Sequence, residues 1–334
     1  MNTKATPVII GGGGWGTALA HLLACATKRP VSLLTRNSDI ATAVNGRHEN
    51  PRYLPGIKLS EGVHATLANA SLRRAELVVL AVPCQSLRDA LEHYGPFVTD
   101  NAITINAAKG IELETLLTPR DIVAQAAPFL AGRYATLSGP SFAREVVRNK
   151  PTAVILGCAD AELAVRLRAV FATSWFRAYS SPDVLGVELG GGVKNVMAIA
   201  AGLSDGLDFG HNARAALISR GLAEMIRLGV ALGAQAATLS GLSGLGDLVL
   251  TCTGDLSRNR QTGLRLGRGE QLHDIVASLG SVAEGVKTTA SLLALAQRAG
   301  VDMPIVNAVH GVLYEQLPVK EAVRGLFERE LKAE

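Results

Sequence analysis

Three glycines near the N-terminus constrain the fold of this chain more than any other feature. Gly11 ends the apolar run 7–11 (PVIIG), and Gly13 and Gly16 follow at the start of a stretch with helical composition. In a strand–turn–helix unit the first glycine allows a tight turn, the second lets the backbone approach a pyrophosphate, and the third lets the helix pack on the strand. The pattern predicts a dinucleotide site, although a plain glycine-rich turn would show the same spacing.

Further apolar runs in the first half of the chain extend a sheet around this motif. They alternate with helical stretches, and such alternation is typical of a parallel sheet covered by helices on both faces. The predicted strands are 7–11, 31–35, 76–82, 102–107, 134–139 and 152–157, with 175–180 as a candidate edge strand.

Strand patterns end near residue 183, and only helical patterns follow. The sequence therefore predicts an α/β domain over residues 1–183 and an all-helical domain over residues 184–334, with no Pro- or Ser-rich linker between them. The predicted helices are 184–208, 212–234, 259–269, 271–279, 283–299, 304–315 and 319–332.

Composition narrows the class of protein. A chain of 334 residues with 48% apolar residues can bury the cores of about two domains. Its four cysteines are far apart and form no CxxC or Cys/His cluster, so we expect a reduced compartment and no metal site. The net charge of +4 is too small to indicate a nucleic-acid partner. Four consecutive glycines interrupt the apolar stretch 8–26, so we expect no signal peptide, no membrane span and a cytoplasmic protein.

The residues that end the second predicted strand indicate the type of dinucleotide. Enzymes selective for NAD usually place Asp or Glu there to bind the ribose 2′-hydroxyl. This chain has Thr35-Arg36-Asn37 instead. A carboxylate would repel a 2′-phosphate, whereas a guanidinium can pair with it. Arg36 therefore favours NADPH, with NADH still usable, unless it is a solvated surface side chain.

Polar groups follow the strands at the edge where such sheets bind ligands. Lys109 comes just after a predicted strand, where a cation would meet an anionic cofactor or substrate, or would simply lie on the surface. Residues 139–143 either begin a helix whose N-terminus suits an anion or form an ordinary Ser/Pro cap.

A second anion site is predicted further along the chain. Ser257-Arg258-Asn259 begins a predicted helix and combines backbone N–H groups with a guanidinium, which suits a phosphate dianion. The four arginines at 258, 260, 265 and 268 could also form a nucleic-acid stripe, but no aromatic residues lie between them.

Six segments of the chain carry a family resemblance. The segments GGGGWGTALA, NAAKGIE, LSGPSFARE, ELGGGVKNVMAIAAG, SGLGDLVLTCTGDLSRNR and MPI occur in order through nearly the whole chain. They resemble the bacterial NAD(P)-dependent glycerol-3-phosphate dehydrogenases. The resemblance implies a Rossmann domain joined to an all-helical domain, a homodimer, and interconversion of dihydroxyacetone phosphate and sn-glycerol 3-phosphate for phospholipid synthesis.

The resemblance also implies roles for individual residues, with Lys194 as the catalytic base. A departure from the family is Gly14, where many members carry serine. The substrate residues implied are Lys109, Gly139, Ser141, Lys194, Asp247, Ser257, Arg258 and Asn259. The cofactor residues implied, with the loop glycines Gly11, Gly13 and Gly16, are Gly14, Trp15, Arg36, Lys109, Ala143, Arg258, Val282 and Glu284.

This role explains why the apolar segment 188–202 contains Lys194. Oxidising an alcohol by hydride transfer requires removal of the hydroxyl proton, and a lysine in a dry cleft can accept it because desolvation lowers its pKa from ~10.4 towards neutrality. We expect Gly190 and Gly191 on the preceding turn to leave room for substrate and nicotinamide. The resemblance implies that Asp247 and Asn195 orient the amine and the substrate. A structural tether between domains is the alternative role of the lysine.

Two other functions share parts of this pattern. A β-hydroxyacid dehydrogenase has the same architecture but places an asparagine four residues after the lysine, where this chain has Ala198. A non-catalytic NADPH-sensing protein would keep the glycines and Arg36 but would not need both Lys194 and the Ser-Arg-Asn segment.

Overall fold

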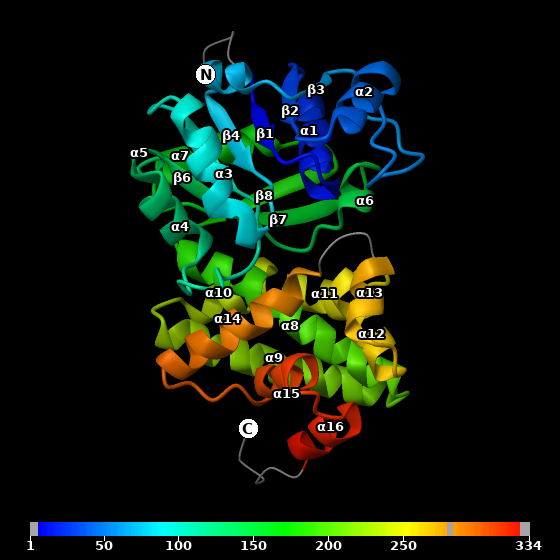
Figure 1. Ribbon diagram of the computed structural model, residues 1–334. Helices are drawn as coiled ribbons and strands as arrows, with labels where there is room; N and C mark the ends of the chain where they lie inside the picture. Colours follow the sequence, from blue (N-terminus) through cyan, green and yellow to red (C-terminus); the bar gives the residue numbers. More distant parts are fainter. Residues whose placement is uncertain (1–5, 279–282, 328–334) are drawn as a thin grey trace. The chain divides into compact units, whose positions relative to one another are not determined.

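The computed structural model describes residues 6–278 and 283–327, which form two compact units (Figure 1). Unit 1 is the chain up to Lys109 together with Leu117–Glu188. Unit 2 is Gly110–Leu116 together with the chain from Leu189 onward. The helix α8 (Val184–Gly206) runs through both, because its first turn belongs to unit 1. The boundary predicted at residues 183 and 184 lies about one helical turn earlier.

Unit 1 is built on an eight-stranded sheet with the order β3-β2-β1-β4-β5-β6-β7-β8. The predicted α/β sheet is confirmed, with one difference in direction: β7 runs antiparallel to β6, and β8 is parallel to β7. The strands are β1 (Val8–Ile10), β2 (Val31–Leu34), β3 (Val63–Thr66), β4 (Leu77–Leu80), β5 (Ile103–Asn106), β6 (Tyr134–Ser138), β7 (Thr152–Gly157) and β8 (Phe176–Ser181).

Helices cover both faces of this sheet, because successive strand residues point to opposite sides. In β1, Ile9 packs in the core with α1, α2 and α7, whereas Val8 and Ile10 pack in the core with α3 and α4. The helices of unit 1 are α1 (Gly14–Thr27), α2 (Ser38–Arg47), α3 (Leu87–Tyr94), α4 (Pro119–Ala126), α5 (Pro128–Ala131), α6 (Ala143–Val146) and α7 (Ala161–Phe171), with 3₁₀ turns at Asn69–Arg74, Cys84–Ser86 and Gly95–Phe97.

The register of the parallel strands places their carboxyl ends side by side. Ile10 pairs with Leu34 of β2 and with Leu80 of β4, and Leu80 pairs with Asn106 of β5. The chain reverses its direction of winding between β1 and β4, and ligands of such sheets bind at this reversal. The residues that follow these strands are therefore the candidates for a ligand site in unit 1.

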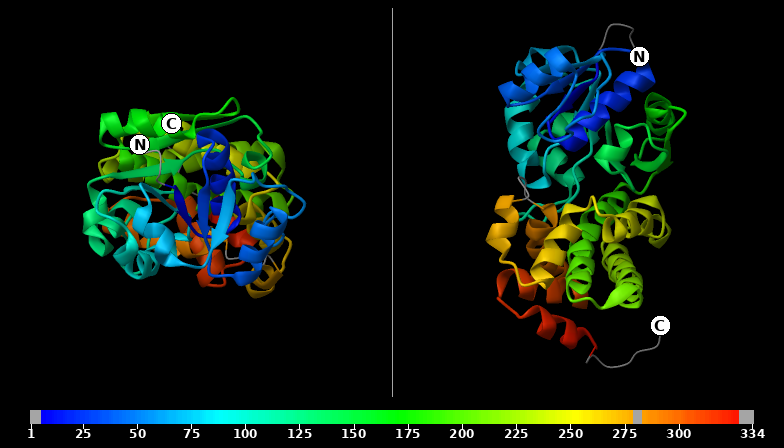
Figure 2. Two further views of the ribbon diagram at one scale, coloured as in Figure 1. Left: turned by 90° about the horizontal axis from the view of Figure 1, so that it is seen from above. Right: turned by 90° about the vertical axis from the view of Figure 1, so that its right-hand side faces the viewer.

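Unit 2 is helical in its described part, with α8 surrounded by α9, α12 and α14 (Figure 2). Among the described residues α8 is long and apolar enough to cross a membrane, but 94% of this stretch is buried inside the protein. Residues 279 and 328–332 of the predicted helices lie outside the described residues. The elements are α9 (Gly210–Ala231), α10 (Ala236–Leu239), a π-helical turn (Leu242–Gly246), α11 (Asp247–Thr253), α12 (Arg258–Gly267), α13 (Leu272–Ser278), α14 (Glu284–Arg298), α15 (Pro304–Tyr314) and α16 (Val319–Phe327).

Each unit buries a glutamate whose carboxyl group accepts hydrogen bonds. In unit 1, Glu188 accepts from the Tyr134 hydroxyl and from the backbone N–H of Arg120 at 3.1 Å. In unit 2, Glu224 of α9 accepts from the N–H of Ile305 at 2.7 Å and so caps α15. Burial raises the pKa of both carboxyls to about 7.

These raised pKa values predict how stability depends on pH. The carboxyls bind protons up to about pH 7 in the folded chain but lose them near 4.5 when unfolded, so the unfolding free energy falls as pH rises through this window. Replacing Glu188 with Gln removes the part of this decrease in unfolding free energy that Glu188 contributes. The melting temperature of Glu188→Gln relative to wild type should therefore rise between about pH 5 and about pH 8. The prediction would be contradicted if the melting temperatures of Glu188→Gln and wild type differed by the same amount at both pH values.

Candidate active site

The glycine loop of unit 1 has the geometry predicted for a pyrophosphate site. Gly11 has a φ of +122°, and a Cβ atom there would lie 2.5 Å from the carbonyl oxygen of Ala81. A Cβ on Gly16 would overlap the carbonyl oxygen of Gly11. A Cβ on Gly13, in contrast, would meet open space, and Gly13 precedes α1 without a side-chain cap. The N–H groups that begin α1 can therefore bind an anion above Gly13.

Other side chains adjoin the glycine loop. Gly14 faces Tyr53 and Ala143, with their Cβ atoms 3.7 and 4.0 Å from the position of a Cβ on Gly14, so a small side chain such as serine would fit here too. The indole Nε1 of Trp15 is buried and has no hydrogen-bond partner among the described residues. Asn50, which the sequence analysis missed, fixes the loop by donating to the carbonyl of Gly12 at 3.1 Å.

Arg36 follows β2 and is exposed next to the glycine loop. The preceding Thr35 is buried, and a Cβ on Gly12 would lie 2.5 Å from its hydroxyl oxygen. Asn37 uses its side-chain oxygen to cap α2, accepting from the N–H of Ile40 at 2.9 Å. The turn that carries Arg36 is thus fixed on both sides, and the guanidinium extends from it.

Lys109, Gly139 and Ser141 are brought together in unit 1. The Lys109 Nζ donates to the carbonyl of Gly139 at 3.1 Å, and the Ser141 hydroxyl donates to the same oxygen at 2.9 Å. Asn106 shapes the turn before Lys109, because its side chain accepts from the N–H of Ala108 at 3.0 Å and donates to the carbonyl of Ala108 at 2.9 Å. Asn106 was not predicted as a site residue, although an asparagine at the end of a strand is a signal for such a turn.

Lys194 forms a buried ion pair in unit 2. Its Nζ lies 2.7 Å from Oδ1 of Asp247 and donates to the Thr251 hydroxyl at 2.9 Å. Lys194 is 8% exposed and Asp247 is 1% exposed. Thr251 was not predicted, but it lies four residues after Asp247 on α11, a spacing that places both on one helix face. This arrangement gives the ammonium two fixed acceptors.

Two asparagines connect the lysine to the predicted phosphate segment. Asn259 accepts from the N–H of Gly285 at 3.0 Å with its Oδ1, so its Nδ2 faces Asn195 and donates to Asn195 Oδ1 at 2.9 Å. Asn195 directly follows Lys194 on α8, and Gly285 follows Glu284, the first residue of α14. The fixed orientation of Asn259 also fixes Asn195, which leaves the Nδ2 of Asn195 as a donor for a ligand.

The Ser-Arg-Asn segment begins α12, as predicted. Ser257 is the N-cap residue, and its hydroxyl accepts from the N–H of Arg260 at 3.2 Å. Arg258, the first residue of the helix, is exposed. Of the arginines considered for a nucleic-acid stripe, Arg260 is buried against Asp205, and Arg265 is paired with Glu270. Val282 lies outside the described residues.

Gly190 has a use that differs from the expected one, whereas the expectation for Gly191 stays a prediction. A Cβ on Gly190 would lie 2.7 Å from the carbonyl oxygen of Ser243, and one on Gly192 would lie 3.4 Å from Cα of Gly110. Gly190 thus lets α8 touch the π-helical turn that leads into Asp247, and Gly192 lets it touch the segment Gly110–Leu116. Close packing of backbone, rather than space for ligands, is what these two glycines provide.

The fold and these residues define the class: a dehydrogenase that uses a nicotinamide dinucleotide, with a glycine loop on a Rossmann sheet and a buried lysine–aspartate pair on a helical unit. Family models for the N-terminus and the C-terminus of NAD-dependent glycerol-3-phosphate dehydrogenase match residues 7–164 and 183–324. The chain belongs to this family and is an oxidoreductase.

Individual relatives are similar over the whole length. The chain is 56% identical to the glycerol-3-phosphate dehydrogenase (NAD(P)+) of Nitratidesulfovibrio vulgaris strain DP4, covering 98% of this chain and 99% of the relative. It is 51% identical to that of Lawsonia intracellularis, covering 100% and 96%. The crystal structure of the Coxiella burnetii glycerol-3-phosphate dehydrogenase superimposes with a TM-score of 0.92 at 39% identity, covering 97% of this chain and 99% of that one.

The packing of Gly190 predicts the effect of a small substitution. Gly190→Ala would press a methyl group against the backbone of Ser243, and overpacking of this kind costs about 1–3 kcal/mol. Because Ser243 belongs to the turn before Asp247, kcat should fall together with the melting temperature. Gly46→Ala in α2, where a Cβ meets open space, is the control and should preserve both. A Gly190→Ala enzyme with wild-type kcat would show that this contact does not position Asp247.

Proposed function

We propose that this chain reduces dihydroxyacetone phosphate to sn-glycerol 3-phosphate with NADPH in preference to NADH, and that it also catalyses the reverse reaction. The observation that supports this most is the buried Lys194–Asp247 pair, connected through Asn195 and Asn259 to the first turn of α12. A proton donor and a helix N-terminus suited to an anion lie on the same unit. An enzyme that reduces a phosphorylated ketone needs both.

Each group of residues has a separate task in this proposal. When bound to unit 1, a nicotinamide dinucleotide supplies the hydride that the carbonyl carbon accepts. Lys194 donates a proton from Nζ to the oxygen of the new alcohol and recovers a proton from solvent; in the reverse direction it accepts the hydroxyl proton. Asp247 and Thr251 hold the ammonium in place. The Nδ2 of Asn195 hydrogen bonds to the substrate.

The phosphate group is assigned to the start of α12. The guanidinium of Arg258 and the N–H groups of the first helical turn can both bind a dianion, and the partial positive charge of the helix N-terminus adds to them. The Ser257 hydroxyl already caps the helix, so we assign it the task of shaping this turn. Lys109, Gly139 and Ser141 are proposed as further substrate residues, and Lys109, Arg258 and Glu284 as cofactor residues.

The remaining parts of the proposal follow from the family resemblance. They are a homodimer, a cytoplasmic location and a supply of sn-glycerol 3-phosphate to glycerophospholipid synthesis. The experiment that tests the central part is oxidation of NADPH by the purified enzyme, assayed with dihydroxyacetone phosphate and with unphosphorylated dihydroxyacetone. A strong preference for the phosphorylated ketone supports the proposal, and equal use of both ketones would refute it.

Arg258 should supply much of this preference. Loss of a charge-assisted contact in a closed site costs roughly 2–5 kcal/mol, so Arg258→Ala should lose kcat/KM heavily on dihydroxyacetone phosphate and little on dihydroxyacetone. Arg268→Ala is a matched control, because Arg268 is an exposed arginine at the other end of the same helix. If Arg258→Ala lost the same factor on both ketones, the arginine would act through folding or cofactor binding alone and would not bind the substrate phosphate.

Arg36 should set the preference for NADPH. A partly exposed pair with the 2′-phosphate is worth about 1–3 kcal/mol, so Arg36→Asp should raise KM for NADPH by about one or two decades. NADH use should stay similar or improve, because Asp can accept hydrogen bonds from the ribose hydroxyls. Arg47→Asp, at the exposed far end of α2, changes the net charge equally and should leave the ratio alone. An unchanged NADPH/NADH ratio of kcat/KM in Arg36→Asp would show that this turn does not bind the 2′-phosphate.

A further inference from the structure

Two arginines near the start of α12 have opposite environments. Arg258 is exposed, whereas Arg260, two residues later, is 8% exposed. Both lie on the first turn of α12. If Arg258 binds the substrate phosphate, Arg260 must have a different role. The contacts of Arg260 answer this question.

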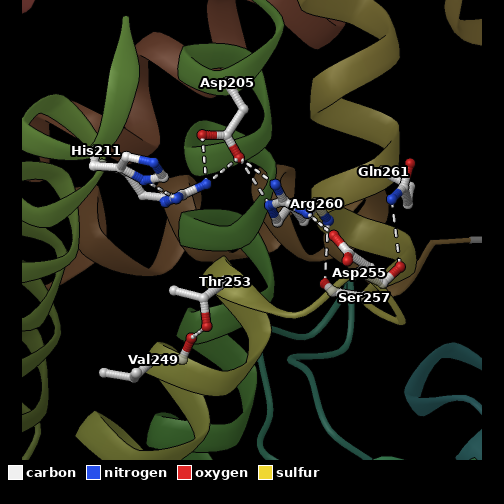
Figure 3. A network of polar contacts seen from close by, with 9 residues as sticks. Asp205, His211, Val249, Thr253, Asp255, Ser257, Arg260 and Gln261 are labelled. Atoms are coloured by element: carbon white, nitrogen blue, oxygen red, sulfur yellow. Dashed lines mark hydrogen bonds and ion pairs between the residues drawn. The ribbon is translucent and has the colours of Figure 1, made fainter. Parts of the chain in front are cut away.

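Arg260 joins three segments of unit 2 (Figure 3). Its Nε and Nη2 lie 2.8 and 2.7 Å from Oδ2 of Asp205 on the last turn of α8. Its Nη1 lies 2.9 Å from Oδ1 of Asp255, which is in the loop before α12. The guanidinium thus ties the start of α12 to α8 and to the loop that leads into the helix.

Asp205 is shared with a second guanidinium. Arg214 of α9 donates through Nη1 to both carboxylate oxygens, at 2.9 and 3.0 Å, and its Nη2 lies 2.6 Å from Nδ1 of His211. The side chains of Asp205 and Arg260 are each 10% exposed, so solvent screens their attraction little. One carboxylate therefore connects three helices near their ends: the last turn of α8, the second turn of α9 and the first turn of α12.

The backbone of the same turn is also held tightly. A Cβ on Gly202 of α8 would overlap the carbonyl oxygen of Arg260, and one on Gly263 of α12 would overlap that of Ile199. Glycine at both positions lets the two helices touch along their backbones. This contact sets the distance between α8 and α12. The ion pairs of Arg260 set the position of α12 along α8 and its rotation about its own axis.

We propose that Arg260 and Asp205 are positioning residues for the phosphate site. They hold the first turn of α12 where Arg258 reaches the substrate phosphate and where Asn259 hydrogen bonds to Asn195 beside Lys194. The inference rests on the proposed function, since it explains how that site is kept in place. In a well-ordered site a displacement of about 1 Å costs about 100-fold in rate, so a loosened α12 weakens phosphate binding even with Arg258 present.

The test compares Asp205→Asn and Arg260→Gln with wild type. We expect KM for dihydroxyacetone phosphate and the inhibition constant of inorganic phosphate to rise about 10-fold to 100-fold. We expect kcat at saturation and the weak use of dihydroxyacetone to fall less, because they depend on the start of α12 only through the hydrogen bond from Asn259 to Asn195. Arg260→Lys keeps the charge but not the two-atom contact with Asp205, and it should show an intermediate rise.

Glu224→Gln is the control for stability, because it removes a buried carboxylate from the same unit without touching α12. If both test variants lower the melting temperature but keep wild-type constants for dihydroxyacetone phosphate and phosphate, the two residues only stabilise the fold and the inference is wrong. If they do not fold, Arg260→Lys and Asp205→Glu carry the same comparison. Failure of the proposed function looks different, because the wild-type enzyme would then not distinguish the two ketones.

Discussion

The ion pair between Lys194 and Asp247 is the interaction on which the rest of unit 2 depends. Taking an ammonium and a carboxylate out of water costs several kcal/mol for each ion, and their attraction offsets this only when the geometry is close and their other polar atoms are satisfied. The 2.7 Å contact and the hydroxyl of Thr251 meet these conditions. The pair holds the Nζ of Lys194 at a fixed point on α8, which the proposed proton transfer requires.

The surrounding packing exists to bring these groups together. Gly190 lets α8 touch the turn before Asp247, Gly202 lets it touch α12, and Asn259 joins α12 and α14 to the residue next to the lysine. Each glycine weakens the helix by about 1 kcal/mol, which a buried helix tolerates because its stability comes from packing. In this view the glycine-rich sequence around Lys194 is the cost of bringing backbones close enough for the pair to form.

Much of this could be predicted from the sequence, and the exceptions have physical reasons. The parallel strands are continuous apolar runs, but β3 is an edge strand in which Val63 and Ala65 face inward while His64 is exposed, so its pattern alternates and was missed. The turn at Leu242–Gly246 was missed because two of its five residues are glycines, and α11 was missed because it is short and contains the β-branched Val249, Thr251 and Thr253. Lys194, Asp247 and Asn259 were expected from the family resemblance. Thr251, Asp205 and Arg260 were not, because ion pairs and hydrogen bonds between distant segments leave no local pattern.

The most direct test of this account is the turnover of Lys194→Met, which removes the ammonium while keeping a long side chain. With dihydroxyacetone phosphate and NADPH, kcat should fall about 10²–10⁴-fold, the range typical for loss of a general acid. Binding of NADPH, measured by fluorescence titration, should remain near wild type, because the glycine loop and Arg36 belong to unit 1. A Lys194→Met enzyme that kept most of its wild-type turnover would contradict the claim that this lysine transfers the proton.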